Sequence, residues 1–139
     1  MYERILVAHD GSDSGRRALS TAIDLGKRLK AELHMLSVEE LPRFPTTMDE
    51  VIEEKAIENH VFKSVVTQAQ AAAKAKRVRV KIHVIAGHPV KAIVDFAKRQ
   101  RSDLLVIGYH GHSALHGALI GGTAERIVRH APCAVLVVK

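Results

Sequence analysis

The stretch Ile5-Leu6-Val7-Ala8-His9-Asp10-Gly11-Ser12 joins a short apolar run to polar residues and a glycine. An apolar run that stops at turn-forming residues is typical of a strand buried on both faces of a sheet. Similar runs follow at residues 33–38, 103–107 and 134–138. Residues 77–84 instead alternate between basic and apolar side chains, and this period of two predicts a strand with one basic face.

Segments with apolar residues at helical spacing lie between these strands. We expect Asp13 or Ser14 to cap the first helix, and a capping box of Thr47 and Glu50 to begin the second after a loop at 39–47. The expected helices cover about residues 14–29, 47–76, 89–101 and 123–130.

The order of these elements predicts an α/β fold. Strands that alternate with helices pair in parallel through right-handed crossovers, which gives an open five-stranded sheet with helices on both faces. The sequence shows no change of composition and no internal repeat, so we expect residues 1–139 to form a single domain.

Length, charge and cysteine content narrow the class of protein. A chain of 139 residues can bury a sufficient core without disulfides or metal. No apolar run is long enough to span a membrane, and the first residues lack the layout of a signal peptide. The single cysteine, Cys133, cannot form an intramolecular disulfide, so we expect a cytoplasmic protein. The net charge of +6 indicates an anionic partner.

Residues that directly follow the strands are the candidates for a site, because ligands of open α/β sheets bind beyond the carboxyl ends of the strands. The most informative segment is 108–123, which holds five of the nine glycines. Glycine lets backbone amides approach an anion closely, and Gly121-Gly122-Thr123 opens a helix whose first amides are unpaired. The segment therefore favours phosphate binding over a mere connection, although it is not a Walker A loop.

Other chemistries fit the residue patterns less well. The spacings of His110, His112 and His116 suit a preformed metal site poorly, whereas His110 and His112 could donate hydrogen bonds to phosphate. The hydrolase residue types around Asp10 lack a nucleophile elbow. Basic residues at 74–81 have no aromatic neighbours to stack on bases, so we expect no nucleic-acid partner, and the same charges would protect a sheet edge from aggregation.

Gly108, Gly111 and Gly121 are spaced as Gly-x2-Gly-x9-Gly, between matching flanks that extend from Asp10 to the closing residues 131–138. On these residues the whole chain resembles the universal stress protein family, in its nucleotide-binding branch. The resemblance implies an adenine nucleotide alpha hydrolase-like fold with strand order 3-2-1-4-5. It also implies an adenine-nucleotide pocket where the first and fourth strands lie side by side.

The resemblance further implies how ATP, or else AMP or ADP, would be bound, with Mg²⁺ on the phosphates. The adenosine end would contact Asp10 and the backbone at the ends of the first two strands. The glycines would line the ribose and the phosphates, and the helix start at 121–123 would hold the phosphate tail. The candidate cofactor-binding residues are Ala8, His9, Asp10, Val38, Gly108, His110, Gly111, His112, Gly121, Gly122 and Thr123.

One position departs from the family pattern, which places Ser or Thr after the third glycine. This chain has Gly122 there, so a hydroxyl donor to phosphate is missing unless Thr123 replaces it.

Three hypotheses for function follow. One is a stress-response regulatory protein that binds ATP, with occupancy ordering residues 109–122 and with slow hydrolysis at most. The alternative is a nucleotide-free protein-interaction module. A phosphohydrolase that holds a metal on Asp10 is a third hypothesis, but no general base is placed for rapid turnover.

The closing strand at 134–138 carries no charge before Lys139. In the implied strand order 3-2-1-4-5, the third and fifth strands form the edges of the sheet. An apolar edge strand needs a cover, and a two-fold partner strand provides one. We therefore expect a homodimer that forms through residues 134–138.

Overall fold

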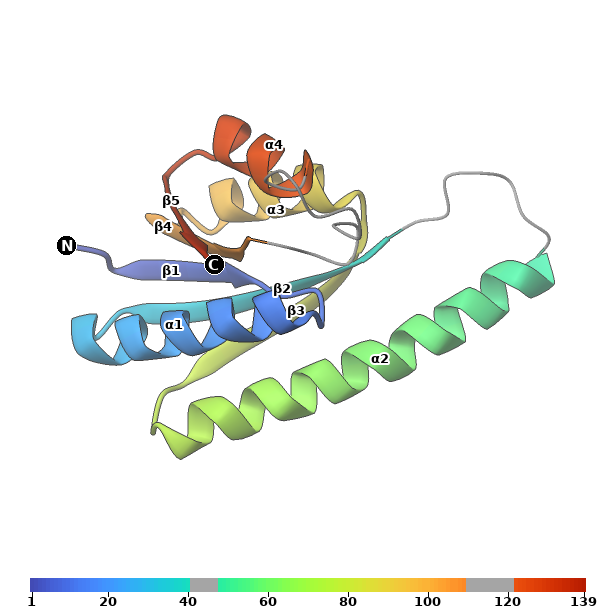
Figure 1. Cartoon of the computed structure of the whole chain (residues 1–139), viewed down its shortest axis with the longest axis horizontal. Coiled ribbons are helices and arrows are strands. Elements are labelled where there is room, and N and C mark those ends of the chain that lie inside the picture. Colours follow the sequence, from blue (N-terminus) through green and yellow to red (C-terminus); the bar gives the residue numbers. More distant parts are fainter. Residues whose placement is uncertain (41–47, 110–121) are drawn as a thin grey trace.

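The computed structural model describes residues 1–40, 48–109 and 122–139, and the side chains of residues 48–61 lie outside that description. Helices and strands alternate along the chain, as Figure 1 shows. The elements are β1 (Arg4–Ala8), α1 (Asp13–Leu29), β2 (Glu32–Glu40), α2 (Met48–Ala75), β3 (Val80–Gly87), α3 (Pro89–Arg99), β4 (Leu104–Gly108), α4 (Gly122–His130) and β5 (Ala134–Val138). None of the described helices is both long and apolar enough to cross a membrane.

The five strands form one parallel sheet in the order β3-β2-β1-β4-β5, which confirms the predicted fold class and strand order. Ile5 of β1 lies opposite Leu33 of β2 on one side and Leu104 of β4 on the other. The central strand β1 therefore joins the two halves of the sheet, and β3 and β5 are its edges.

Alternate residues of each strand face opposite layers of helices (Figure 1). Ile5 and Val7 pack with α1 and α2, where Ala69 and Ala73 add small buried side chains that the sequence analysis did not place in the core. Leu6 packs on the other face with α3 and α4. Two apolar cores, one on each face, hold the strand ends in fixed positions.

The start of α1 differs from the sequence-based expectation. Ser12, and not Asp13 or Ser14, is the N-cap, and its Oγ accepts a hydrogen bond from the Gly15 amide at 3.0 Å. Ser14 is instead buried, with 3% of its surface exposed. The predicted cap was therefore wrong by one or two positions, because the turn after β1 closes earlier than the apolar spacing of the helix suggests.

Strand β3 begins later than the alternating pattern predicts. Arg77 has a left-handed backbone (φ 59°) and closes the turn after α2, so pairing with β2 starts only where Val80 meets Leu33. The predicted basic face is also incomplete, because the ring of His83 packs against Phe96 of α3, with 4.8 Å between ring centroids. Lys81 alone keeps an exposed basic side chain on that face within β3.

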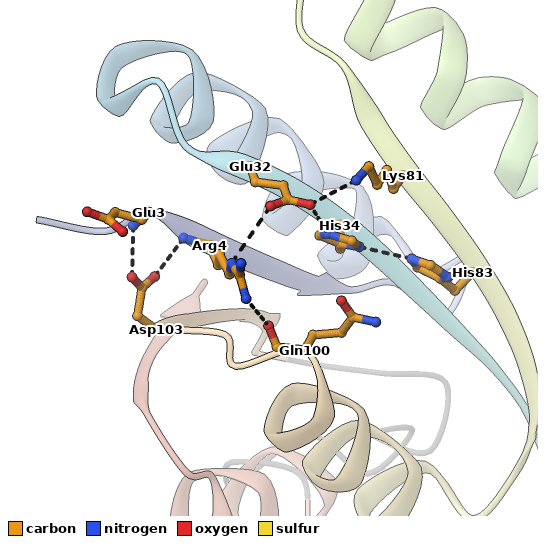
Figure 2. Close-up of polar contacts among 8 residues, drawn as sticks. All are labelled: Glu3, Arg4, Glu32, His34, Lys81, His83, Gln100 and Asp103. Carbon is orange, nitrogen blue, oxygen red and sulfur yellow. Dashed lines mark hydrogen bonds and ion pairs between the residues drawn. The ribbon is translucent and has the colours of Figure 1, made fainter.

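A polar network crosses β1, β2 and β3 beside α3 (Figure 2). The Nδ1 of His34, whose side chain is buried, lies 2.9 Å from the Nε2 of His83, and its Nε2 lies 2.9 Å from Oε1 of Glu32. Glu32 also accepts a hydrogen bond from Lys81 Nζ at 2.9 Å and lies 3.8 Å from Arg4 Nε. The bonds from Lys81 and His34 lower the pKa of Glu32 to about 2, so this carboxylate stays charged.

Candidate functional site

The carboxyl ends of β1 and β4 lie side by side at the centre of the sheet, where the chain order reverses. From β1 the chain continues to β2 on one side, and from β4 it continues to β5 on the other. In open α/β sheets, loops that leave such a point in opposite directions bound a ligand crevice, so this edge of the sheet is the expected place for one. Ala8, Asp10 and Gly108 belong to this edge of the sheet, and Val38 lies near the carboxyl end of the adjacent strand β2.

His9 fixes the first turn of this edge through three hydrogen bonds. Its amide donates to Leu36 O at 3.0 Å, and its carbonyl accepts from the buried Ser37 Oγ at 2.7 Å. The ring Nδ1 accepts from the Gly11 amide at 3.2 Å. A ring nitrogen that accepts from an amide carries no proton, so this geometry requires a neutral His9. The residue thus shapes the backbone of the site.

Asp10 is half-buried directly after this turn. Its Oδ1 accepts a hydrogen bond from the Ser12 amide at 3.0 Å, which makes an Asx turn. Gly11 has a φ of 89°, a conformation that favours glycine, and it lets the chain reverse between Asp10 and Ser12. The carboxylate is therefore held at the mouth of the crevice, ahead of the first turn of α1.

Two glycines allow β1, β4 and the start of α1 to come together. A Cβ built on Gly108 would lie 2.4 Å from Ser14 Oγ and 2.8 Å from the backbone C and O atoms of Ser14. A Cβ on Gly15 would lie 2.4 Å from His9 Nδ1 and 3.1 Å from Asp10 Oδ1. Neither position has room for a side chain, so glycine is needed at both.

The amino-terminal end of α4 is the remaining described part of the predicted site. The helix begins at Gly122, one residue before the predicted start, and Gly122 is exposed while Thr123 is half-buried. Among the residues that the structure describes, a Cβ on Gly122 would meet only Arg126 Nη2, at 3.7 Å, which is an ordinary contact. Serine at position 122 would therefore fit without rearrangement.

The predicted residues divide into those that the structure describes and those that it does not. Ala8, His9, Asp10 and Gly108 come together at the β1/β4 edge. Four other candidates, His110, Gly111, His112 and Gly121, lie outside the described residues. Among the described side chains, those of residues 1–40, 62–109 and 122–139, no group of three or more His, Cys, Asp or Glu could hold a metal ion.

The sequence analysis missed Ser14 and Gly15 as residues of this edge. Both are buried and both face the groups that define the crevice. A signal was present, because small residues at 11, 12, 14 and 15 directly follow the strand. Tyr109 was not assigned to the site either. Its amide donates to Val138 O at 2.8 Å, and Lys139 Nζ lies 5.5 Å from its ring centroid.

Cys133 is half-buried just before β5. Burial raises the pKa of its thiol, and the charge of Asp103 adds to that rise. A thiol that stays protonated is a poor nucleophile, and Cys133 packs against the core beside α3 and α4.

An open parallel sheet with helices on both faces, whose strand order reverses between β1 and β4, defines an α/β protein of the doubly wound class. A family model described as the universal stress protein family matches residues 1–139. The chain belongs to the universal stress protein family.

Relatives and solved structures agree with this assignment. A universal stress protein of Thermus aquaticus is 30% identical over 142 residues, which cover 100% of both chains. Universal stress protein UspA from Lactobacillus plantarum has a TM-score of 0.88 and 30% identity, with 99% of this chain and 98% of that one covered. A universal stress protein crystallised in complex with cAMP has a TM-score of 0.78 and 27% identity, covering 99% and 97%.

Proposed function

We propose that the crevice between β1 and β4 binds an adenine nucleotide, with ATP as the expected ligand, and that occupancy serves regulation in a stress response. The observation that carries the proposal is the close approach of Gly108 to Ser14, which leaves no room for a side chain where the two strand ends meet. A glycine at this position keeps a side chain away from the place where the carboxyl ends of the two strands meet. The cAMP complex of a 27% identical relative supports an adenine ligand.

One described residue is suited to the adenosine end of such a ligand, and others are suited to its phosphate end. The Asp10 carboxylate can accept hydrogen bonds from ribose hydroxyls or base nitrogens that carry hydrogen. The first amides of α4, at Gly122 and Thr123, can donate to phosphate oxygens with the favourable end of the helix dipole behind them. We expect Mg²⁺ to be carried by the phosphates, since Mg²⁺ in nucleotide sites keeps several waters and is bound largely through the phosphate oxygens of the substrate.

The hydrogen bonds of His9 and Asp10 favour nucleotide binding without rapid hydrolysis. Nδ1 of His9 accepts from the Gly11 amide, and Oδ1 of Asp10 accepts from the Ser12 amide. Groups that hold a turn in this way are poorly disposed to activate water, because a general base must be within reach of the proton it removes. We therefore expect slow hydrolysis at most, with the bound nucleotide acting as a signal.

Calorimetric titration with ATP, AMP and cAMP, with and without Mg²⁺, tests the proposal. We expect Asp10→Asn to weaken ATP binding about tenfold, because a charge-assisted hydrogen bond of about 1.5 kcal/mol is reduced. Asp13→Asn is the matched control, since Asp13 is exposed and pairs with Arg16. It should bind ATP like the wild type. No heat at millimolar ATP would overturn the proposal and favour a nucleotide-free interaction module.

A second variant in the same titration gains a contact instead of losing one. Gly122→Ser restores the hydroxyl of the family pattern at a position with room for it. We expect ATP to bind about fivefold tighter, the equivalent of one hydrogen bond of about 1 kcal/mol, and adenosine to bind unchanged. A gain for adenosine as well would mean that position 122 does not face the phosphates.

We also propose that the chain forms a homodimer through β5. One side of β5 pairs with β4 and the other is an edge of the sheet. Four of its five residues are half-buried, and the strand carries no charge. Pairing with a second β5 would satisfy the open backbone groups. Light scattering at micromolar concentration should give twice the mass of one 15.2 kDa chain, and a clean monomer would refute the dimer.

A further inference from the structure

A second concave surface lies at the opposite end of the sheet, where β2 and β3 begin. It is a cavity of about 450 Å³, which we name the basic groove. Its charged lining consists of one carboxylate, Glu32, and five cations: Lys27, Lys30, Arg77, Arg79 and Lys81. The elements that supply its lining, the end of α1, the segment after α2 and the starts of β2 and β3, lie on the left in Figure 1.

The charges of the basic groove are poorly balanced by the protein. Lys81 donates to Glu32 at 2.9 Å, and Figure 2 shows Glu32 between Lys81, His34 and Arg4. Among the described residues, no carboxylate lies within 4.0 Å of the side-chain nitrogens of Lys27, Lys30, Arg77 or Arg79. Like charges gathered in a concave surface repel one another and raise the local concentration of anions.

The lining of the basic groove also has an apolar part, which we name its floor: Gly26, Ala31, Leu33 and Val78. Gly26 lies against Leu33, with 3.7 Å between a Cβ built on Gly26 and the Cβ of Leu33. A neighbouring hollow of about 550 Å³ shares Arg77, Val78 and Arg79 and adds Lys74. Cavities of this size accommodate small molecules, and cations around an apolar floor suit a compact organic anion.

Two simpler roles account for only part of this arrangement. Cations in the last turn of a helix offset its dipole, which explains Lys27 of α1 but neither Arg79 nor Lys81 beyond α2. Charges on an edge strand discourage aggregation, which explains Lys81 of β3 but neither Lys27 nor Lys30. Neither role explains why the cations at the end of α1 and those near the start of β3 line the same cavity.

We propose that the basic groove binds a multiply phosphorylated small molecule, at a site separate from the nucleotide crevice. β2 begins at the groove with Glu32 and ends near the crevice with Glu40, so its nine residues separate the two sites by roughly 27 Å. The proposal is independent of the proposed nucleotide function. Arg77, Arg79 and Lys30 bind the phosphates, and the apolar floor receives the carbon skeleton.

Backbone geometry allows a clean test. Lys30 and Arg77 have left-handed backbones with φ of 53° and 59°, a conformation that asparagine tolerates well. The triple variant Lys30→Asn, Arg77→Asn, Arg79→Gln therefore removes three charges without added strain. The matched control is Lys63→Gln, Lys98→Gln, Arg101→Asn, which removes three charges from exposed residues that do not line the groove, one of them also left-handed.

The probe is sodium tripolyphosphate in calorimetric titrations, with and without saturating AMP. The triple variant is expected to bind it at least about tenfold more weakly than the wild type, because charge-assisted hydrogen bonds are lost. The control variant should bind within about twofold, and AMP should change neither result.

Four outcomes would overturn the proposal. The first is that the wild type does not bind tripolyphosphate, and the second is that the triple variant and the control variant are weakened equally. The third is that AMP competes with tripolyphosphate while the triple variant binds it like the wild type. The fourth is that a single-stranded DNA binds more tightly than tripolyphosphate through the same three residues. The third outcome would place the phosphates in the nucleotide crevice, and the fourth would make the groove a nucleic-acid surface.

Discussion

Replacing Gly108 with alanine is expected to lower the free energy of unfolding by about 3 kcal/mol. The new Cβ would lie 2.8 Å from the backbone C and O atoms of Ser14, and no side-chain rotation can relieve a clash with backbone. The end of β4 and the start of α1 would have to separate. Urea unfolding at neutral pH measures the loss directly.

Two controls separate this packing effect from a general cost of losing a glycine. Gly122→Ala adds the same methyl group where the nearest atom is Arg126 Nη2 at 3.7 Å, so its stability should change by less than about 1 kcal/mol. Adding Ser14→Ala to Gly108→Ala removes the Oγ contact at 2.4 Å but leaves the backbone clash, so it should not restore stability. Rescue by Ser14→Ala, or a Gly108→Ala protein as stable as the wild type, would contradict the geometry.

The parallel sheet and the helix layers were predictable because apolar runs and helical spacing are local signals, whereas the strand order 3-2-1-4-5 followed from the resemblance to the universal stress protein family. β5 occupies residues 134–138 as predicted, since an uninterrupted apolar run ends at a charged residue. The start of β3 was not predictable in the same way. The alternation continues back to Arg77, and only pairing of Val80 with Leu33, together with the left-handed turn at Arg77, decides where the strand begins.

The candidate site likewise has features that could be predicted and features that depend on tertiary packing. Placing Asp10 and Gly108 at one edge follows from the strand order, because the carboxyl ends of neighbouring parallel strands lie together. The close approach of Gly108 to Ser14 joins segments far apart in sequence, and the distance between them depends on how closely α1 packs on β4. No periodicity in the sequence encodes that distance. The roles of Ser14 and Gly15 became visible only with the tertiary packing.

Replacing Phe96 with alanine is expected to lower the free energy of unfolding by about 3–5 kcal/mol and to change how stability depends on pH. Phe96 of α3 is 6% exposed, and the centroid of its ring lies 4.8 Å from that of His83. Burial, with smaller contributions from His34 and Lys81, holds the pKa of His83 below its ordinary value of 6.5. Water admitted by the smaller side chain should let that pKa return toward 6.5.

The sign of the pH effect follows from proton uptake. His83 in the wild type binds a proton less readily when folded than when unfolded, so stability falls as pH drops from above 6.5 toward the lowered pKa of the folded state. Glu32 acts in a second window, because its pKa of about 2 lies below its ordinary value of 4.5. Its contribution is present above 4.5 and disappears as pH falls toward 2.

Phe62→Ala distinguishes the local effect on His83 from the general loss of stability. Phe62 is 9% exposed on α2, which covers the opposite face of the sheet from α3 (Figure 1). Both variants should lose similar stability at neutral pH, measured by urea unfolding, but only Phe96→Ala should flatten the decline just below pH 6.5. The decline below pH 4.5 should persist in both, because neither variant removes Lys81 or His34 from Glu32. If both variants kept the wild-type slope near pH 6.5, cover by Phe96 would not be what lowers the pKa of His83.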